Sequence, residues 1–392
     1  MSGAVAPVVQ SRPRLRPGLN GVIQAAAGAG LLALAAGVAA QPGGSWRLAA
    51  LAITGALIGA TLLRTSFGFA NAFRAVVDRG DLSGLRAHAA MIALASLLML
   101  PMLAMGHVAG QPMAGEATRV GVGFAVGALL FGAGMQVGGG CASGTLFSLG
   151  GGDAKLAGTL AGFVLGSTLG AAHMGFWWSL PSLPGATAQG LVGFGPALAL
   201  QLAMLGALAW VAGPGADRVR MRALVRGGLA LACLNALTLL LSGHPWGETS
   251  AFALWGSQLA AHIGFDPAHW AYWQRPGFGA KLRHTPLLDV SSVMDAAIVL
   301  GAVLAAARAG LFRPRLGGGP LAWSAAVLGG VAMGYGARLA NGCNIGAYFS
   351  ALSMGNLSGW AWMVLALAGS WVGARLRPVF GLSGRRGDGP AC

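Results

Sequence analysis

The sequence predicts an all-α polytopic membrane protein with about ten transmembrane helices in two pseudo-symmetric repeats, inverted relative to each other, with cysteine-bearing re-entrant turns. Three observations predict this fold class. Of the 392 residues, 55% are hydrophobic and only 9% are charged, whereas soluble domains carry about 25% charged residues. Apolar runs of roughly 20 residues, the length that crosses a bilayer as a helix, recur along the whole chain. Finally, two similar glycine–cysteine blocks lie 202 residues apart, at Cys141 and Cys343.

The apolar runs predict the order of the spans. One further segment, 250–264, is apolar for only about fifteen residues, which favours a re-entrant or interfacial piece over a span. The first run follows arginines and resembles a secretory signal, but it is long for a signal core, so we predict a retained helix. The ten predicted spans are 21–40, 48–64, 87–106, 119–136, 156–177, 190–212, 223–242, 287–308, 321–339 and 357–375.

The net charge of +15 comes from arginines that gather in short clusters beside the apolar runs. This distribution is typical of the positive-inside rule and predicts no nucleic-acid partner. With the clusters in the cytoplasm, both termini and the loops 65–86, 213–222 and 309–320 lie inside. The sequence therefore predicts a multi-pass membrane protein with both termini in the cytoplasm, surrounded by lipid.

The glycine–cysteine blocks belong to an internal repeat. At an offset of 202 residues Cys141 aligns with Cys343, and the residues at 147 and 148 (Phe, Ser) align with those at 349 and 350. The same offset carries 21–40 onto 223–242. The predicted organisation is a cytoplasmic tail 1–20, a first half 21–178, a linking helix 190–212, a second half 223–375 and a cytoplasmic tail 376–392. The predicted topology places the two cysteine turns on opposite sides, as in an inverted repeat.

Each cysteine lies between glycines, which suits a sharp turn at membrane depth. Irregular backbone survives there only where protein or a water-filled cavity covers it, and glycine allows a positive φ. A short helix that starts at each cysteine would point its free N–H groups toward an anion. The alternative is that the glycines serve close helix packing alone. The candidate residues of the turns are Gly140, Gly144, Gly342, Gly346 and Asn344.

A thiol without a basic neighbour stays protonated in an apolar site and is a weak donor and a soft acceptor. Such a group can hold a sulfur-bearing anion loosely, as conduction requires. Arg338, five residues before Cys343, is a candidate anion attractor, or else it extends to the interface. Asp295 lies inside a predicted span, as a site member or as a hydrogen-bonding residue. Cys233 and Cys392 are predicted to play no part in the site.

Several chemistries lack their sequence signature. The chain has no CxxC pair, no cluster of histidines and cysteines at metal-ligand spacing, and no GxxxxGK[ST] pattern for ATP hydrolysis. The sequence therefore predicts a transport protein rather than an enzyme, without a cofactor or a metal.

The chain resembles the YeeE/YedE family of bacterial inner-membrane sulfur transport proteins. The resemblance implies a pore in which axial cysteines pass thiosulfate along by S–H···S contacts, a role that falls on Cys141 and Cys343. Thiosulfate-transporting relatives have a further axial cysteine where this chain has Ser291 and Ser292, so another sulfur or selenium species is an alternative substrate. The motifs that carry the resemblance are GGGCASGTLFSLGGG (138–152), ARLANGCNIGAYFSALSMGNLSGWAW (337–362), FGFANAFR (67–74) and HPWGETSAFALWG (244–256).

Two functions follow as expectations. The first is a permease for a small inorganic sulfur anion, most of all thiosulfate. The second is a membrane component of a sulfur or selenium relay or redox system, which needs reactive thiolates near His or Lys. A cytoplasmic sulfur-carrier or rhodanese-like protein is a candidate partner in either case.

The predicted topology can be tested with reporter fusions. Fusions after Gly80 and after Leu316 are expected to report the cytoplasm, and a fusion near Ser182 the periplasm, because the arginine clusters stay inside. Alkaline phosphatase activity and fluorescence of paired fusions measure this. A periplasmic signal at Leu316 would mean that 250–264 spans the membrane and that both cysteine turns lie on one side.

Overall fold

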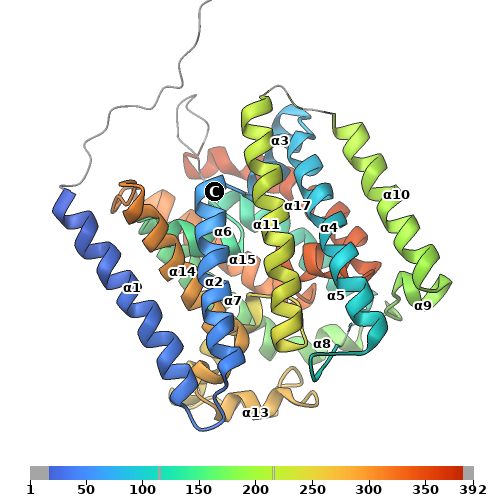
Figure 1. Cartoon of the computed structure of the whole chain (residues 1–392), viewed down its shortest axis with the longest axis horizontal. Helices are drawn as coiled ribbons and strands as arrows, with labels where there is room; N and C mark the ends of the chain where they lie inside the picture. Colours follow the sequence, from blue (N-terminus) through green and yellow to red (C-terminus); the bar gives the residue numbers. More distant parts are fainter. Residues whose placement is uncertain (1–16, 114, 116, 214, 216, 383–392) are drawn as a thin grey trace, which may run out of the picture.

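The computed structural model describes residues 17–382 apart from 114, 116, 214 and 216. The described chain is nearly all helical (Figure 1), with two small antiparallel sheets of two strands each. Most of the two predicted tails, residues 1–16 and 383–392, lies outside the described residues, as does Cys392.

The first part of the chain forms seven helices before a connecting region. A break at Gly138–Cys141 separates α5 from the short α6, so the polypeptide turns there instead of continuing one helix. These helices are α1 (Pro17–Ala40), α2 (Trp46–Thr65), α3 (Phe69–Arg79), α4 (Ser83–Met105), α5 (Val122–Val137), α6 (Ala142–Gly150) and α7 (Lys155–Ala172).

The later part of the chain repeats this alternation of long and short helices. The π-helix η3 follows Cys343, as α6 follows Cys141. The elements are α10 (Phe194–Ala212), α11 (Arg218–Ser242), α12 (Thr249–His262), α14 (Val290–Arg308), α15 (Pro320–Leu339), η3 (Asn344–Ser350), α16 (Ala351–Ser353) and α17 (Ser358–Leu376).

Short elements complete the described chain and lie in its connections. The strands pair as β1 with β2 and β3 with β4. These elements are β1 (His107–Val108), β2 (Gln111–Pro112), β3 (Val120–Gly121), α8 (Met174–Ser179), β4 (Ser182–Leu183), α9 (Ala188–Val192), η1 (Pro267–His269), α13 (Phe278–Arg283), η2 (Pro286–Leu288) and η4 (Arg377–Phe380).

Eight helical stretches of the described chain are long and apolar enough to cross a membrane. They cover the first eight predicted spans, with most ends shifted by a few residues. Two of them, Trp46–Arg79 and Val122–Gly150, continue beyond the predicted ends through α3 and α6. Helices α15 and α17 lie where the last two spans are predicted, but their composition is less apolar. Of the ten predicted spans, eight are therefore found as candidate membrane spans in the described chain. Both helices are packed against several others, and a helix enclosed by protein needs less apolar surface than one that faces lipid.

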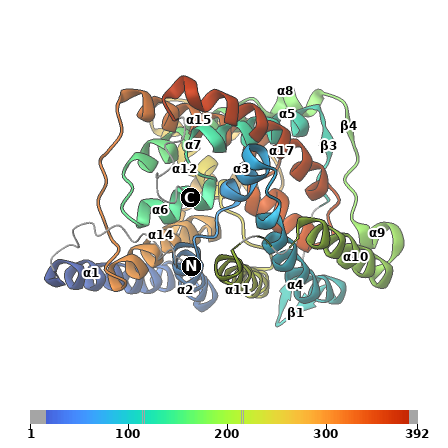
Figure 2. The same cartoon turned by 90° about the horizontal axis from the view of Figure 1, so that it is seen from above.

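The helices form two main rows. Figure 2 shows α1, α2, α11, α4 and α10 along one side and α15, α7, α5 and α17 along the other, with α3, α6 and α12 between them. Helix α14 packs on α1 and α2, and α4 packs on α10 and α11. The core, which includes both cysteines, lies between the rows.

Glycines bring the helices of the second row into backbone contact. A Cβ added at Gly166 of α7 would clash with the carbonyl oxygen of Val331 in α15, and one at Gly369 of α17 with that of Leu129 in α5. Only glycine allows helices to approach this closely. Glycine packing is therefore the structural basis of this row, independent of the cysteine turns.

The molecule has two faces with different loops. On the arginine-rich face, defined by segments 64–86, 213–226 and 308–319, Gly215 lies beside Ser83 and residue 153 pairs with residue 315. On the hairpin face, defined by segments 41–45, 106–121 and 173–193, Arg47 donates a hydrogen bond to the carbonyl of Ala109. In Figure 1, α3 lies at one end and α8 and α13 at the other.

The segment 243–289 begins and ends on the hairpin face. Gly243 lies against Pro112 at its start, and Leu288 lies near Gly43 at its end. Helix α12, which it contains, packs instead on α7, α14 and α15. This is the arrangement that a non-spanning 250–264 requires.

The close contact of α7 with α15 can be tested by one added methyl group. Gly166→Ala is expected to lower the thermal unfolding midpoint in detergent, because the clash costs about 1–3 kcal/mol of strain. Gly206→Ala in α10 is the matched control, since an added Cβ there meets nothing within 4 Å. Equal midpoints for the two variants would show that the helices can separate at no cost.

Candidate functional site

The first cysteine caps helix α6. Cys141 has an extended backbone (φ −83°, ψ −171°), and its sulfur accepts a hydrogen bond from the backbone N–H of Gly144 at 3.4 Å. Its sulfur also lies 3.4 Å from the hydroxyl of Ser143, and the backbone of Ala70, at the start of α3, reaches it too. The thiol is therefore held among donors, at the N-terminal ends of α3 and α6.

The second cysteine occupies the same position in its turn. Cys343 caps η3 with φ −102° and ψ −167°, and its sulfur accepts a hydrogen bond from Ile345 N–H at 3.4 Å. Glycine is required just before it, because Gly342 has φ +141°, a conformation that side chains rarely adopt. The preceding Asn341 is left-handed as well, with φ +57°.

A carboxyl group contacts the second cysteine and interacts electrostatically with the first. Oε2 of Glu248, the residue before α12, lies 3.7 Å from the sulfur of Cys343, which donates its S–H. Glu248 also interacts electrostatically with Cys141. Both thiols and the carboxyl are at most 1% exposed. The three groups therefore form one buried cluster, which we call the cysteine–glutamate site (Cys141, Cys343, Glu248).

Other buried polar groups around this site lack partners. Asp295 of α14 is fully buried, interacts electrostatically with Glu248, and neither carboxyl oxygen has a hydrogen-bond partner among the described residues. The side chain of Asn344, the residue after Cys343, is also fully buried, and neither of its polar atoms has a hydrogen-bond partner among the described residues. Buried polar atoms are normally paired, so unpaired ones next to the site are suited to binding a polar ligand.

A hydrogen-bonded network fixes the loop that carries Glu248. Asn235 of α11 accepts from the Trp246 backbone N–H at 2.8 Å and donates to the Ser350 hydroxyl at 3.1 Å. The Ser350 hydroxyl donates in turn to the Trp246 carbonyl at 2.8 Å. This closed network links α11, the loop before α12, and the end of η3. It fixes Glu248 relative to Cys343.

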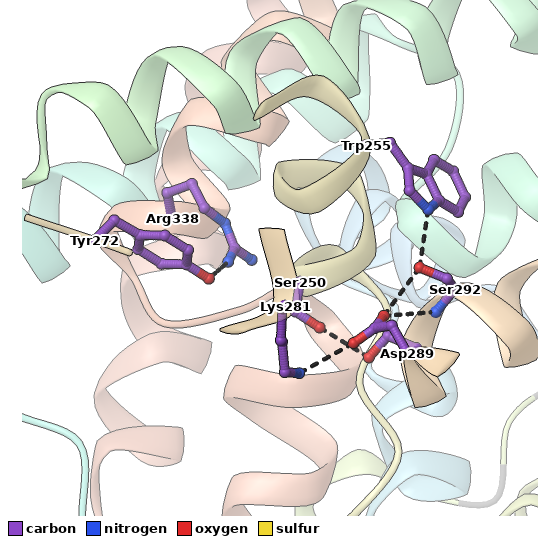
Figure 3. Close-up of polar contacts among 8 residues, drawn as sticks. Ser250, Trp255, Tyr272, Lys281, Asp289, Ser292 and Arg338 are labelled. Carbon is purple, nitrogen blue, oxygen red and sulfur yellow. Dashed lines mark hydrogen bonds and ion pairs between the residues drawn. The ribbon is translucent and has the colours of Figure 1, made fainter. Parts of the chain in front are cut away.

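Arg338 is largely buried, next to the first residue of α12. Its guanidinium donates to the hydroxyls of Tyr272 and, at 2.6 Å, of Thr249, the first residue of α12 (the Tyr272 contact is drawn in Figure 3). The side chain is 8% exposed, and its Nε has no partner among the described residues. The counterpart Gln136 of α5 makes a similar link, since it accepts from Arg74 of α3 at 3.0 Å.

Each of the two faces carries a cavity. A cavity of about 420 Å³ on the hairpin face is lined by Arg119, Trp177, Tyr272, Arg275, Arg338 and Asn341. A smaller cavity of about 230 Å³ on the arginine-rich face is lined by Phe67, Asn71, Arg79, His88, Asp217 and Arg220. Three arginines line the larger cavity and no acidic side chain of the described residues does, so it favours an anion. Two arginines and two aspartates, Asp81 and Asp217, line the smaller cavity, whose charges balance.

Ser291 and Ser292, near the start of α14, are engaged in structural contacts (Figure 3 labels Ser292). Ser291 bonds to Ser250 at 2.8 Å, and Ser292 donates to Asp289 and accepts from the Trp255 indole, each at 2.9 Å. Asp289 also pairs with Lys281 at 3.0 Å. These contacts attach α14 to α12 and leave the serines no role like that of a free thiol.

The remaining predicted site residues differ in their surroundings. Gly140 and Gly144 are buried in the first turn. An added Cβ at Gly346 would meet nothing within 4 Å, so close packing does not require glycine there. Cys233 is exposed on α11, whereas Cys141 and Cys343 are buried. No group of three or more metal-binding side chains occurs within the part of the chain that the structure describes.

Sequence reasoning missed Glu248 and underrated Asp295. Glu248 lies in a quoted motif, but nothing in its local pattern places it beside a cysteine 95 residues away. The available signal was its rarity: the chain has only ten acidic residues, and an ionisable residue in an apolar segment is a functional candidate by default.

The chain is similar to a family and to individual proteins that are named for transport. A family model described as sulphur transport matches residues 64–372. The chain is 30% identical over 154 residues to a probable transporter YedE of Escherichia coli (strain K12), and 31% identical over 154 residues to that of Salmonella typhimurium. It is 26% identical over 342 residues to a thiosulfate transporter TsuA of Spirochaeta thermophila.

The coverage of these matches differs. The matches to the two YedE proteins cover 39% of this chain and only 37% of each relative. The match to the thiosulfate transporter covers 81% of this chain and 96% of that protein.

The network behind Glu248 can be tested at Ser350. Ser350→Ala leaves the Asn235 amide and the Trp246 carbonyl without this partner, which costs about 1–3 kcal/mol for each buried group. We expect a lower thermal unfolding midpoint in detergent. Ser324→Ala, which removes a hydroxyl that bonds only within its own helix, is the control. If the two variants unfold alike, the network does not stabilise the loop.

Proposed function

The chain belongs to the sulphur transport family, and on that premise we propose that it is a permease for a small sulfur-containing anion, most of all thiosulfate. The observation that carries the proposal is the cysteine–glutamate site. Two thiols that are far apart in sequence both interact with one buried carboxyl, which contacts Cys343, and arginines line the cavity on the hairpin face. Membrane transport agrees with the eight apolar helices.

We propose that the fold consists of two inverted halves, α1–α7 and α10–α17. Equivalent glycines support this: Gly132 meets Ala366 across α5 and α17, and Gly334 meets Phe163 across α15 and α7. The packing favours α1 with α10 and α2 with α11 as equivalent pairs, since α14 contacts α1 and α2 as α4 contacts α10 and α11. On this basis 190–212 is the first helix of the second half, and the offset that joined 21–40 to 223–242 does not apply there.

The proposed route runs from the hairpin face to the arginine-rich face. The anion enters the larger cavity, where Arg275 and Arg338 attract it. It then reaches Cys343 and Cys141, whose thiol groups contact its terminal sulfur, and leaves through the smaller cavity. Soft thiol contacts are weak, which allows release as well as binding. This direction places the hairpin face outside and the arginine-rich face in the cytoplasm of an inner-membrane protein.

The alternative function, a sulfur or selenium relay through reactive thiolates, has less support. A thiolate is stabilised by a nearby cation, but the group next to Cys343 is a carboxyl. A thiol that stays protonated suits transport better than sulfur transfer. A cytoplasmic sulfur-carrier or rhodanese-like protein would then receive the anion after release and would not exchange sulfur with the cysteines.

The roles of the thiols can be tested by uptake of radiolabelled thiosulfate. In cells that express the variants, Cys141→Ala and Cys343→Ala are each expected to abolish uptake, or nearly so, at unchanged membrane abundance. Serine should replace either cysteine poorly, because a hydroxyl is a harder group. Cys233→Ala, exposed on α11, is the matched control and should transport normally.

Packing alone predicts another result for these variants. Loss of one buried sulfur would then cost on the order of 1 kcal/mol and lower the abundance, while uptake per molecule stays the same. Full uptake per molecule by both alanine variants would rule out the thiol contacts, and the backbone N–H groups of the turns would have to bind the anion.

A further inference from the structure

Glu248 is central to the cysteine–glutamate site, yet contacts with a sulfur anion do not explain a carboxyl there. Its Oε2 contacts Cys343 at 3.7 Å, its Oε1 has no partner among the described residues, and the side chain is 1% exposed. A negative charge at this position would repel an anion on the adjacent thiol. Because little water screens charges inside a protein, the repulsion would be strong.

The charged groups around Glu248 do not neutralise it. Cys343 and Cys141 carry thiols, and Asp295 of α14 adds a second fully buried carboxyl. Arg338 of α15 contacts Thr249, the residue after Glu248. Its guanidinium donates to the hydroxyls of Thr249 and Tyr272 and, among the described residues, forms no ion pair with Glu248. Glu248 forms no ion pair in the part of the chain that the structure describes.

A proton can neutralise the Glu248 carboxyl where no cationic side chain of the described residues does. Glu248 lies in the segment 243–289, outside the candidate spans, and burial raises the pKa of its carboxyl. A protonated carboxyl removes the repulsion and provides an O–H donor. The O–H on its free Oε1 can then donate to the anion, while Oε2 accepts the hydrogen bond from the Cys343 thiol. The geometry thus suits an anion and a proton that are bound together.

Resting on the proposed transport function, we propose that Glu248 binds a proton whenever the anion occupies the site beside Cys343, so that the protein transports anion and proton together. The proton is taken up with the anion from the hairpin face and released with it on the arginine-rich face. No bond to sulfur forms or breaks. Each dianion such as thiosulfate then crosses with part of its charge compensated.

The first test uses the purified full chain in proteoliposomes, with equal pH on both sides and radiolabelled thiosulfate. Thiosulfate stays a dianion between about pH 6 and pH 9, so it does not titrate itself. Above the pKa of one essential acid, the wild-type rate should fall about tenfold for each pH unit. Glu248→Gln, which is neutral at every pH and still accepts the thiol hydrogen bond, should give a flat profile and exceed the wild type at high pH.

The matched control is Asp78→Asn, which neutralises an exposed carboxyl on α3 and should keep the wild-type profile. A second measurement needs no variant: an inward thiosulfate gradient should acidify liposomes that contain a trapped pH-sensitive dye. A wild-type pH profile in Glu248→Gln, or thiosulfate uptake without acidification, would overturn proton binding at Glu248 and leave the transport function intact. If the wild type takes up no thiosulfate at any pH, the proposed function fails, and this proposal with it.

Discussion

The structure depends on one constraint: a polar group at the depth of a membrane must find its partner within the protein. Water is absent there, and each unpaired group costs several kcal/mol. The network of Asn235, Trp246 and Ser350 meets this constraint. It also positions the loop that carries Glu248. The groups that stay unpaired on Glu248, Asp295 and Asn344 are therefore informative. Glu248 contacts Cys343, Asn344 follows Cys343 in the chain, and Asp295 interacts electrostatically with Glu248.

Close packing and irregular backbone have separate roles in this fold, although glycine serves both. At Gly166 and Gly369 an added methyl group would strike a carbonyl oxygen of the facing helix, so glycine there lets helices touch. At Gly342 the positive φ requires glycine in a turn. Gly346 has neither close neighbours nor a positive φ. The two explanations offered by the sequence, packing and turn formation, thus apply at different positions.

The short helices α3 and α12 connect the rows to the site. Helix α3 begins beside Cys141, and α12 begins beside Cys343 through Glu248. Each is tied to a long helix by a polar side chain, Gln136 in one case and Arg338 in the other. Anchoring on rigid helices limits the freedom of both turns, as a binding site for a small ion requires.

The membrane class, the first eight apolar helices and the equivalent repeat positions of Cys141 and Cys343 could be predicted from the sequence. These features follow from composition, run length and a gap-free repeat, all of which are local or periodic. Tertiary structure alone decided that Glu248 contacts Cys343 and that Arg338 donates to Thr249 and Tyr272. It also decided that α10 packs on α4 as α1 packs on α14. A pattern along the chain shows which residues are buried, but only the packing of the helices decides which buried groups meet.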